Sequence, residues 1–140
     1  MKYKILILIL ITFASCESKI DDKLKFTNMT KKEIFVKVSL GHQFIDSLLN
    51  NCTSNLWIAQ YSSRHIKPDL SEKFPVWVSW ESFIENSADK KVCFYVFGGI
   101  AFGKFRRGEI NKTRLKYKQL DFTKEQLVKL NWEVVFRDSI

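Results

Sequence analysis

"KVCFYVF", residues 91–97, carries the strongest β-strand signal in this chain of 140 residues. Val, Phe and Tyr dominate it, and β-branched and aromatic side chains are enriched in strands. A second stretch, "IFVKVSL" at residues 34–40, alternates apolar and polar side chains. That alternation places every second residue on one face, which is typical of a half-buried strand. The two stretches predict a β-rich fold.

Shorter stretches on either side extend the pattern. Residues 24–28 also alternate, and a turn-like segment separates them from residues 34–40, so the two predict a β-hairpin. Gly98 and Gly99 end the strand at 91–97, and the segment around Pro68 is predicted to be a loop spanning residues 61–74. Further strand candidates lie at residues 56–59, 76–78, 115–120 and 132–136.

Two short helices are indicated by their capping residues. Ser79 is placed to cap one of them. Thr123 and Gln126 have the spacing of a capping box at the start of the other, which would present Leu127 and Leu130 as a short apolar face. Many short strands with sparse helix predict an all-β, sandwich-like fold. We expect residues 24–140 to form one globular domain.

The N-terminus carries a different signal. Lys2 and Lys4 precede an unbroken aliphatic run at residues 5–11, and small residues precede Cys16. As a helix this run would be about 10 Å long, too short for a hydrocarbon layer of roughly 30 Å, but suited to a signal-peptide core. The alternative is a buried strand, against which the basic start and the small residues argue. We therefore predict that residues 1–15 are a cleaved signal peptide.

Residues 13–16, "FASC", resemble the lipobox of bacterial lipoproteins. The resemblance implies cleavage before Cys16, which then carries a diacylglyceryl thioether and palmitate-type acyl chains. Phe13 departs from the pattern, because the family prefers Leu or another aliphatic residue there. The alternative is an unmodified Cys16 thiol near an ordinary cleavage site. Several acyl chains on one residue would hold the protein at a membrane essentially permanently.

Residues 16–23 are short and charged, which predicts a tether between this anchor and the domain. Their acidic residues resemble the surface-export signals of Bacteroidota lipoproteins. We therefore expect a location in the cell envelope, with the protein anchored by lipid in the outer membrane. The sequence leaves open whether the inner or the outer leaflet holds the anchor.

The mature region resembles a group of small uncharacterised Bacteroidota lipoproteins. The resemblance rests on four segments: "FTNMTKKEIFVKV" at 26–38, "SWESFIEN" at 79–86, "VCFYVF" at 92–97 and the closing residues 115–136. It implies a lipid-anchored β domain and no activity. Gly98 and Gly99 depart from the group, which tends to have an acidic turn after the third segment.

The remaining cysteines are Cys52 and Cys93. An oxidising envelope permits a disulfide between them, which would stabilise the domain by roughly 4 kcal/mol. The alternative, which a domain of this size favours, is two separately buried thiols. The chain has no CxxC pair and no Cys/His ligand spacing, so we expect no metal and no cofactor.

Basic residues gather late in the chain, whose formal net charge is +8. Glu109 is the one acidic residue among them, and an anionic lipid, a glycan or an envelope protein is the expected partner. Phe105 and Tyr117 would suit stacking on nucleic acid, but an envelope protein rarely meets it. The alternative is a solvated face without a ligand. The basic residues are Lys104, Arg106, Arg107, Lys112, Arg114, Lys116 and Lys118.

Catalytic signals are weak. His65 has Ser62, Ser63 and Asp69 nearby in the sequence, but no Gly-x-Ser-x-Gly turn accompanies them. We therefore predict a non-enzymatic binding module. The alternatives are an accessory or structural subunit of an outer-membrane complex, or a hydrolase. A binding module should expose aromatic side chains near the basic face, and a hydrolase should place functional side chains in a pocket. The residues concerned are Trp57, Trp77 and Trp80 for binding and His42, Asp46, His65, Glu81 and Glu85 for catalysis.

Overall fold

A computed structural model describes residues 20–40, 63–138 and 140. In this part of the chain two β-sheets face each other, and the predicted all-β, sandwich-like fold is confirmed. The first sheet has the strand order β4 (Ser71–Lys73), β1 (Lys25–Asn28), β7 (Glu133–Phe136). The second has the order β3 (Ser63–Ile66), β2 (Ile34–Leu40), β5 (Lys91–Gly98), β6 (Tyr117–Thr123). Neighbouring strands are antiparallel except β1 and β7, which are parallel.

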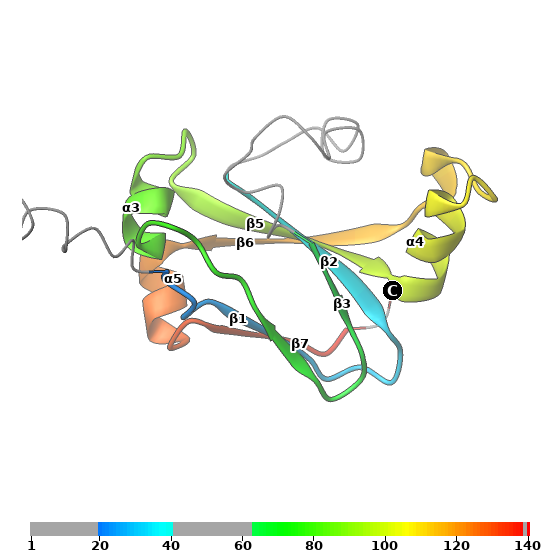
Figure 1. Cartoon of the computed structure of the whole chain (residues 1–140), viewed down its shortest axis with the longest axis horizontal. Helices are drawn as coiled ribbons and strands as arrows, with labels where there is room; N and C mark the ends of the chain where they lie inside the picture. The colour runs from blue at the N-terminus through cyan, green and yellow to red at the C-terminus, as the bar shows by residue number, and fades with distance from the viewer. Residues whose placement is uncertain (1–19, 41–62, 139) are drawn as a thin grey trace, which may run out of the picture.

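Short helices lie at the two ends of this sandwich (Figure 1). The helices α3 (Trp80–Glu85) and α5 (Lys124–Lys129) lie at one end, which we call the α3/α5 end. The helix α4 (Gly99–Arg106) and the 3-10 helix η1 (Lys112–Arg114) lie at the other, the α4 end. Strand β5 runs from one end to the other, and its eight residues span about 25 Å.

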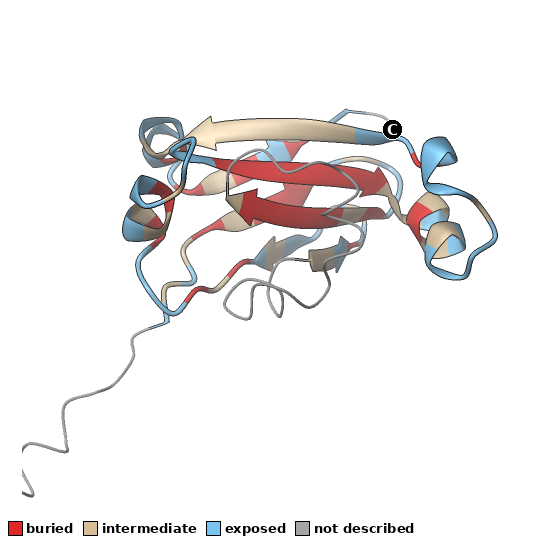
Figure 2. Ribbon diagram, turned by 90° about the horizontal axis from the view of Figure 1, so that it is seen from above, coloured by how far each residue is buried: buried red, intermediate tan, exposed pale blue. Residues whose placement is uncertain are grey.

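The central strand β5 is buried along most of its length (Figure 2). Phe94 points into the core between the sheets, where Phe26 and Phe74 pack around it. The alternate residues of β5 face away from this core, and Phe97 packs there against Phe102 of α4. Burial on both faces explains why this strand has a continuous apolar sequence rather than an alternating one.

Both predicted helix caps are confirmed. The Ser79 hydroxyl accepts the Ser82 backbone N–H of α3 at 3.2 Å. Thr123 and Gln126 form the reciprocal capping box of α5. The predicted apolar face of α5 is only half right, because Leu127 is buried while Leu130 is 45% exposed. Leu130 lies beyond the last helical residue, where the chain turns toward β7.

The predicted hairpin of residues 24–28 and 34–40 is wrong. Both strands form, but β1 and β2 belong to different sheets. The Asn28 side chain fixes the corner between them, since its Nδ2 donates to the carbonyls of Lys32 at 2.9 Å and Ile66 at 3.0 Å. Its Oδ1 accepts the backbone N–H of Thr30 at 3.0 Å. A buried asparagine thus directs the turn from one sheet to the other.

Other expected boundaries also need correction. The described part of the predicted loop at 61–74 contains β3 and β4. Sequence patterns missed these short polar strands because backbone hydrogen bonds to their neighbours hold them, rather than an alternating apolar face. The predicted strand at 76–78 is reduced to one bridge residue, Val76. The strand expected at 115–120 lies at Tyr117–Thr123. The strand expected at 56–59 lies outside the described residues.

The folded domain begins earlier than residue 24. Asp21, which we placed in a tether, exchanges backbone hydrogen bonds with Val76 at 2.8 and 2.9 Å. Its side chain accepts the backbone N–H of Trp80 at 2.8 Å, so the carboxylate serves the first turn of α3 rather than solvent. The signal peptide and Cys16 lie outside the described residues and stay predictions. Within those residues, none of the helices has the length and apolar character needed to cross a membrane.

Candidate functional site

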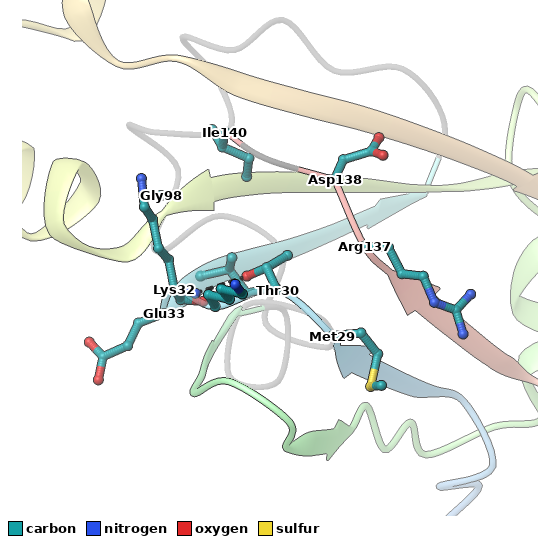
Figure 3. A pocket seen from close by; sticks show the side chains of 10 residues that line it. Met29, Thr30, Lys32, Glu33, Gly98, Arg137, Asp138 and Ile140 are labelled. Atoms are coloured by element: carbon teal, nitrogen blue, oxygen red, sulfur yellow. Dashed lines mark hydrogen bonds between the residues drawn. The ribbon is translucent and has the colours of Figure 1, made fainter.

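A pocket of about 340 Å³ lies at the α4 end of the sandwich (Figure 3). Three separate segments enclose it: the β1–β2 connection, the end of β5 at Gly98 and the segment that follows β7. Its walls are mostly apolar. The lining residues are Met29, Thr30, Lys31, Lys32, Glu33, Ile34, Gly98, Arg137, Asp138 and Ile140.

Backbone contacts hold the three segments together. The Met29 N–H donates to the Phe136 carbonyl at 2.8 Å, which joins the β1–β2 connection to β7. The Gly99 N–H donates to the Glu33 carbonyl at 2.9 Å, which joins the same connection to α4. A Cβ on Gly99 would lie 3.0 Å from the Glu33 oxygen, whereas a Cβ on Gly98 would meet no atom within 4 Å. The glycine at 99 therefore permits the close approach that closes this side of the pocket.

The charges around the pocket are unequal. Of its two carboxylates, Asp138 is paired with a lysine, whose Nζ (Lys118) lies at 3.0 Å, and Glu33 lies 3.2 Å from His65 Nε2. Lys31, Lys32 and Arg137 are exposed and have no ion-pair partner among the described residues. Figure 3 places Lys32 on the β2 side of the pocket and Arg137 on the β7 side. The rim is therefore cationic above apolar walls.

The structure gathers most of the predicted basic residues near this pocket. Six of them are exposed on α4, on η1 or beside them, and we call them the α4–η1 basic surface: Lys104, Arg106, Arg107, Lys112, Arg114 and Lys116. Arg107 is paired with Glu109, which raises the pKa of the guanidinium and lowers the pKa of the carboxyl. Lys118 is separate, because it lies opposite Val96 of β5 and its side chain reaches Asp138.

Cys93 is a free, buried thiol in the structure, and whether it pairs with Cys52 stays an open prediction. Burial, reinforced by the hydrogen bond to Asp121, raises the pKa of the thiol to about 12. A thiol with so high a pKa is neither a nucleophile nor a metal ligand at neutral pH. Cys52 lies outside the described residues.

The residues considered for a hydrolase do not converge. His65 lies on β3 with its ring next to Glu33, whereas Asp69 follows in the next turn and its backbone N–H bonds to Asn28. Ser62, His42 and Asp46 lie outside the described residues. Nothing in the described ranges forms a group of three or more His, Cys, Asp or Glu that could hold a metal ion.

The two glutamates of α3 are held apart by different lysines. Glu81 pairs with Lys23, and Glu85 pairs with Lys124. The hydrogen bond from Lys23 lowers the pKa of Glu81, outweighing the opposing effect of burial. A carboxyl with a lowered pKa stays ionised at neutral pH and does not act as a general acid.

Trp77 and Trp80 do not flank the basic surface. Trp80 is 2% exposed, and its indole N–H donates to the Phe74 carbonyl at 2.9 Å in the core. Trp77 is 41% exposed but lies three residues before the start of α3, at the opposite end from α4. Trp57 lies outside the described residues. The predicted arrangement of tryptophans beside basic residues is therefore wrong for Trp77 and Trp80.

Sequence reasoning missed the pocket, because its walls come from segments far apart in the chain. The nearest signal was the Gly98–Gly99 pair, which marks a close backbone approach.

No protein-family model, curated protein or solved structure matches this chain significantly. The function is therefore argued from the geometry of the site itself.

Proposed function

We propose that this chain is a lipid-anchored, non-enzymatic binding protein of the cell envelope, held in the outer membrane through Cys16. Its ligand is an anionic amphiphile that binds in the pocket at the α4 end. The observation that carries this proposal is the cationic rim of Lys31, Lys32 and Arg137 above apolar walls. The apolar part of the ligand enters the pocket, and its carboxylate or phosphate meets the rim.

The size of the pocket fits such a ligand. Small-molecule sites range from about 300 to 1,000 Å³ and are mostly apolar with a few polar groups. Each buried methylene contributes about 0.8 kcal/mol, so six would contribute about 5 kcal/mol before the cost of association. An exposed cation adds about 0.5 kcal/mol, so three favour an anionic head group roughly tenfold over a neutral one. The apolar walls thus supply affinity and the rim supplies selectivity.

The non-enzymatic character is supported by the chemistry of the lining. Asp138 is paired with Lys118, Glu33 lies next to the His65 ring, and no histidine or cysteine lines the pocket in the described residues. Among the described lining residues the Thr30 hydroxyl is the one alcohol, and it donates to the Lys32 carbonyl at 2.9 Å. No base is placed to activate it.

The anchor is supported by the basic start, the aliphatic run and the "FASC" segment of the sequence. Asp21, five residues after Cys16, is already part of the folded domain, so an anchored domain would lie close to the membrane. We expect Cys16→Ala to release the protein from membranes. Mass spectrometry of the native amino terminus should find acyl chains on Cys16, and an unacylated terminus would refute the anchor.

The binding site can be tested with decanoate as the probe, below its micellar concentration, by calorimetry on the Cys16→Ala chain. We expect saturable binding, weakened about tenfold in the variant Lys31→Ala/Lys32→Ala/Arg137→Ala. The matched control Lys104→Ala/Arg106→Ala/Lys116→Ala removes the same charge from the same end and should bind normally. Decanol, which has no charge, should bind the parent chain and the Lys31→Ala/Lys32→Ala/Arg137→Ala variant equally, with the affinity that decanoate has for this variant. Equal losses in the two variants, or no binding to the parent chain, would refute the site.

A further inference from the structure

Three exposed apolar side chains surround the point where the described chain begins. Ile20 is 50% exposed, Trp77 41% and Val78 50%. They come together because Asp21 and Val76 form an antiparallel bridge. Ile20 precedes one bridge residue and Trp77 follows the other, so antiparallel pairing sets them beside each other. We call these three residues the N-terminal apolar cluster.

The cluster is fixed firmly to the fold. The Asp21 carboxylate bonds the first turn of α3 through the Trp80 N–H at 2.8 Å. Lys23 Nζ lies 3.0 Å from the same carboxylate, pairs with Glu81, and sits 4.4 Å from the centre of the Trp132 ring. The segment leading to the amino terminus is therefore attached to α3 and to the turn before β7, and its direction at Ile20 is set by these contacts.

The cluster also lies close to Cys16 along the chain. Ile20 follows Cys16 by four residues, and even a fully extended chain of that length spans only about 14 Å. The α4 end lies about 25 Å farther on, because β5 separates the two ends. A lipid anchor at Cys16 therefore keeps the cluster near the bilayer. The chain between Cys16 and Ile20 is too short to let the domain turn over and bring the α4 end to the bilayer.

We propose that the N-terminal apolar cluster rests in the interfacial layer of the bilayer that holds Cys16, so that the α4 end and its pocket point away from that membrane. This inference rests on the proposed lipid anchor. Tryptophan is enriched at membrane interfaces, where its ring is apolar and its N–H meets water. Ile20 and Val78 add aliphatic surface beside it, and Lys73 nearby is paired with Asp22.

This orientation limits the source of the ligand. A pocket that opens away from the anchoring bilayer takes its amphiphile from the aqueous compartment or from a facing surface, not from the lipids beneath the domain. The α4–η1 basic surface faces the same way, because α4 begins at Gly99 beside the pocket. The pocket and this basic surface therefore both face away from the anchoring bilayer.

Spin-label depth measurements on the full lipidated chain in liposomes test the orientation. A nitroxide introduced at Val78→Cys should show the high oxygen accessibility of the bilayer interface. A nitroxide at Ile100→Cys, a residue of α4 that is 73% exposed, should show the accessibility of water. Both chains carry Cys52→Ser, and Cys93 is buried, so the label reports one position. An aqueous signal at position 78, or a bilayer signal at position 100, would overturn the inference.

A variant of the cluster separates orientation from anchoring. Trp77→Ser/Val78→Ser should remain in the membrane pellet but lose the fixed distance between a label at position 100 and a membrane dye. Leu70→Ser/Val135→Ser, which changes two exposed apolar residues elsewhere, should keep that distance. An unacylated Cys16 would overturn both the anchor and this inference. An acylated chain whose orientation is the same in both variants would overturn this inference alone.

Discussion

Replacing Gly99 by alanine tests how the pocket is closed. Gly99 is the first residue of α4, and its backbone lies against the β1–β2 connection. The new methyl group would lie 3.0 Å from the Glu33 carbonyl oxygen and 3.1 Å from its carbonyl carbon and Cβ. These atoms cannot yield easily, because Ile34, the next residue, is paired with Gly98 in the sheet. We therefore expect α4 to be displaced or the β1–β2 connection to shift.

The size of the effect follows from two opposing contributions. Overpacking by one methyl against backbone costs about 1–3 kcal/mol. Alanine in place of glycine regains about 0.4–1 kcal/mol, through its lower entropy in the unfolded chain and its higher helix propensity. We expect Gly99→Ala to lower the free energy of unfolding by about 1–2 kcal/mol. Gly98→Ala is the matched control: its Cβ has open space and its φ of −63° suits alanine, so it should be neutral or slightly stabilising.

Chemical denaturation of the two variants measures this difference directly. The denaturant concentration at the unfolding midpoint should be lower for Gly99→Ala than for the parent chain, whereas for Gly98→Ala it should be equal or higher. The m-value, the dependence of the unfolding free energy on denaturant, should be unchanged in both variants. In thermal unfolding the two variants should differ by about 5–10 °C, since 1 kcal/mol shifts a domain of this size by about 4 °C. If Gly99→Ala proved as stable as Gly98→Ala, the close contact with Glu33 would not hold α4 in place.

Three further outcomes are expected. Burial opposes the ionisation of Asp21, but hydrogen bonds from Trp80 and Lys23 outweigh this effect and lower the pKa of the Asp21 carboxyl. The ionised carboxylate therefore stabilises the fold fully above about pH 4, and this stabilisation is lost as the pH falls through the lowered pKa. Asp21→Asn should cost about 1 kcal/mol at pH 7 and flatten the acid limb of a stability–pH profile. Burial raises the pKa of the Cys93 thiol to about 12. In a Cys16→Ala/Cys52→Ser chain, where Cys93 is the one remaining thiol, iodoacetamide at pH 8 should react only upon unfolding, and labelling of the native state would refute the burial of Cys93. Phe102 stacks on Phe35 with ring centres 3.9 Å apart, so Phe102→Ala should cost about 3 kcal/mol and abolish hydrogen-exchange protection in α4; protection that survives would refute this packing.

The sequence predicted those elements whose signal is local. The caps at Ser79 and Thr123 need only residues three positions apart, and the structure contains both. The continuous apolar sequence of β5 reflects burial on two faces, which no loop would show. The pairing of strands could not be obtained in this way. A turn between two alternating stretches suits a hairpin as well as a corner between sheets, and the choice depends on Asn28 contacting Ile66, far away in the sequence.

The candidate site was even less accessible to sequence reasoning. Its rim combines Lys31 and Lys32 with Arg137, and only the parallel pairing of β1 with β7 brings these segments to the same end of the sandwich. The basic segment was recognised by its composition, yet its helical conformation was not. Gly99 and Gly103 are poor helix formers, and α4 is stabilised instead by Phe102 packing under it.

The distribution of charge connects the pocket with the proposed orientation. At the α3/α5 end two lysines are neutralised in pairs, Lys23 by Glu81 and Lys124 by Glu85. At the α4 end the pocket rim keeps Lys31, Lys32 and Arg137 without an ion-pair partner among the described residues, and about 25 Å separates this rim from the other end. The Debye length at physiological ionic strength is about 8 Å, so some three screening lengths would lie between these cations and an anchoring bilayer. Its anionic head groups would neither neutralise the pocket rim nor pull the domain over, and the cations would stay available to a ligand arriving from the opposite side.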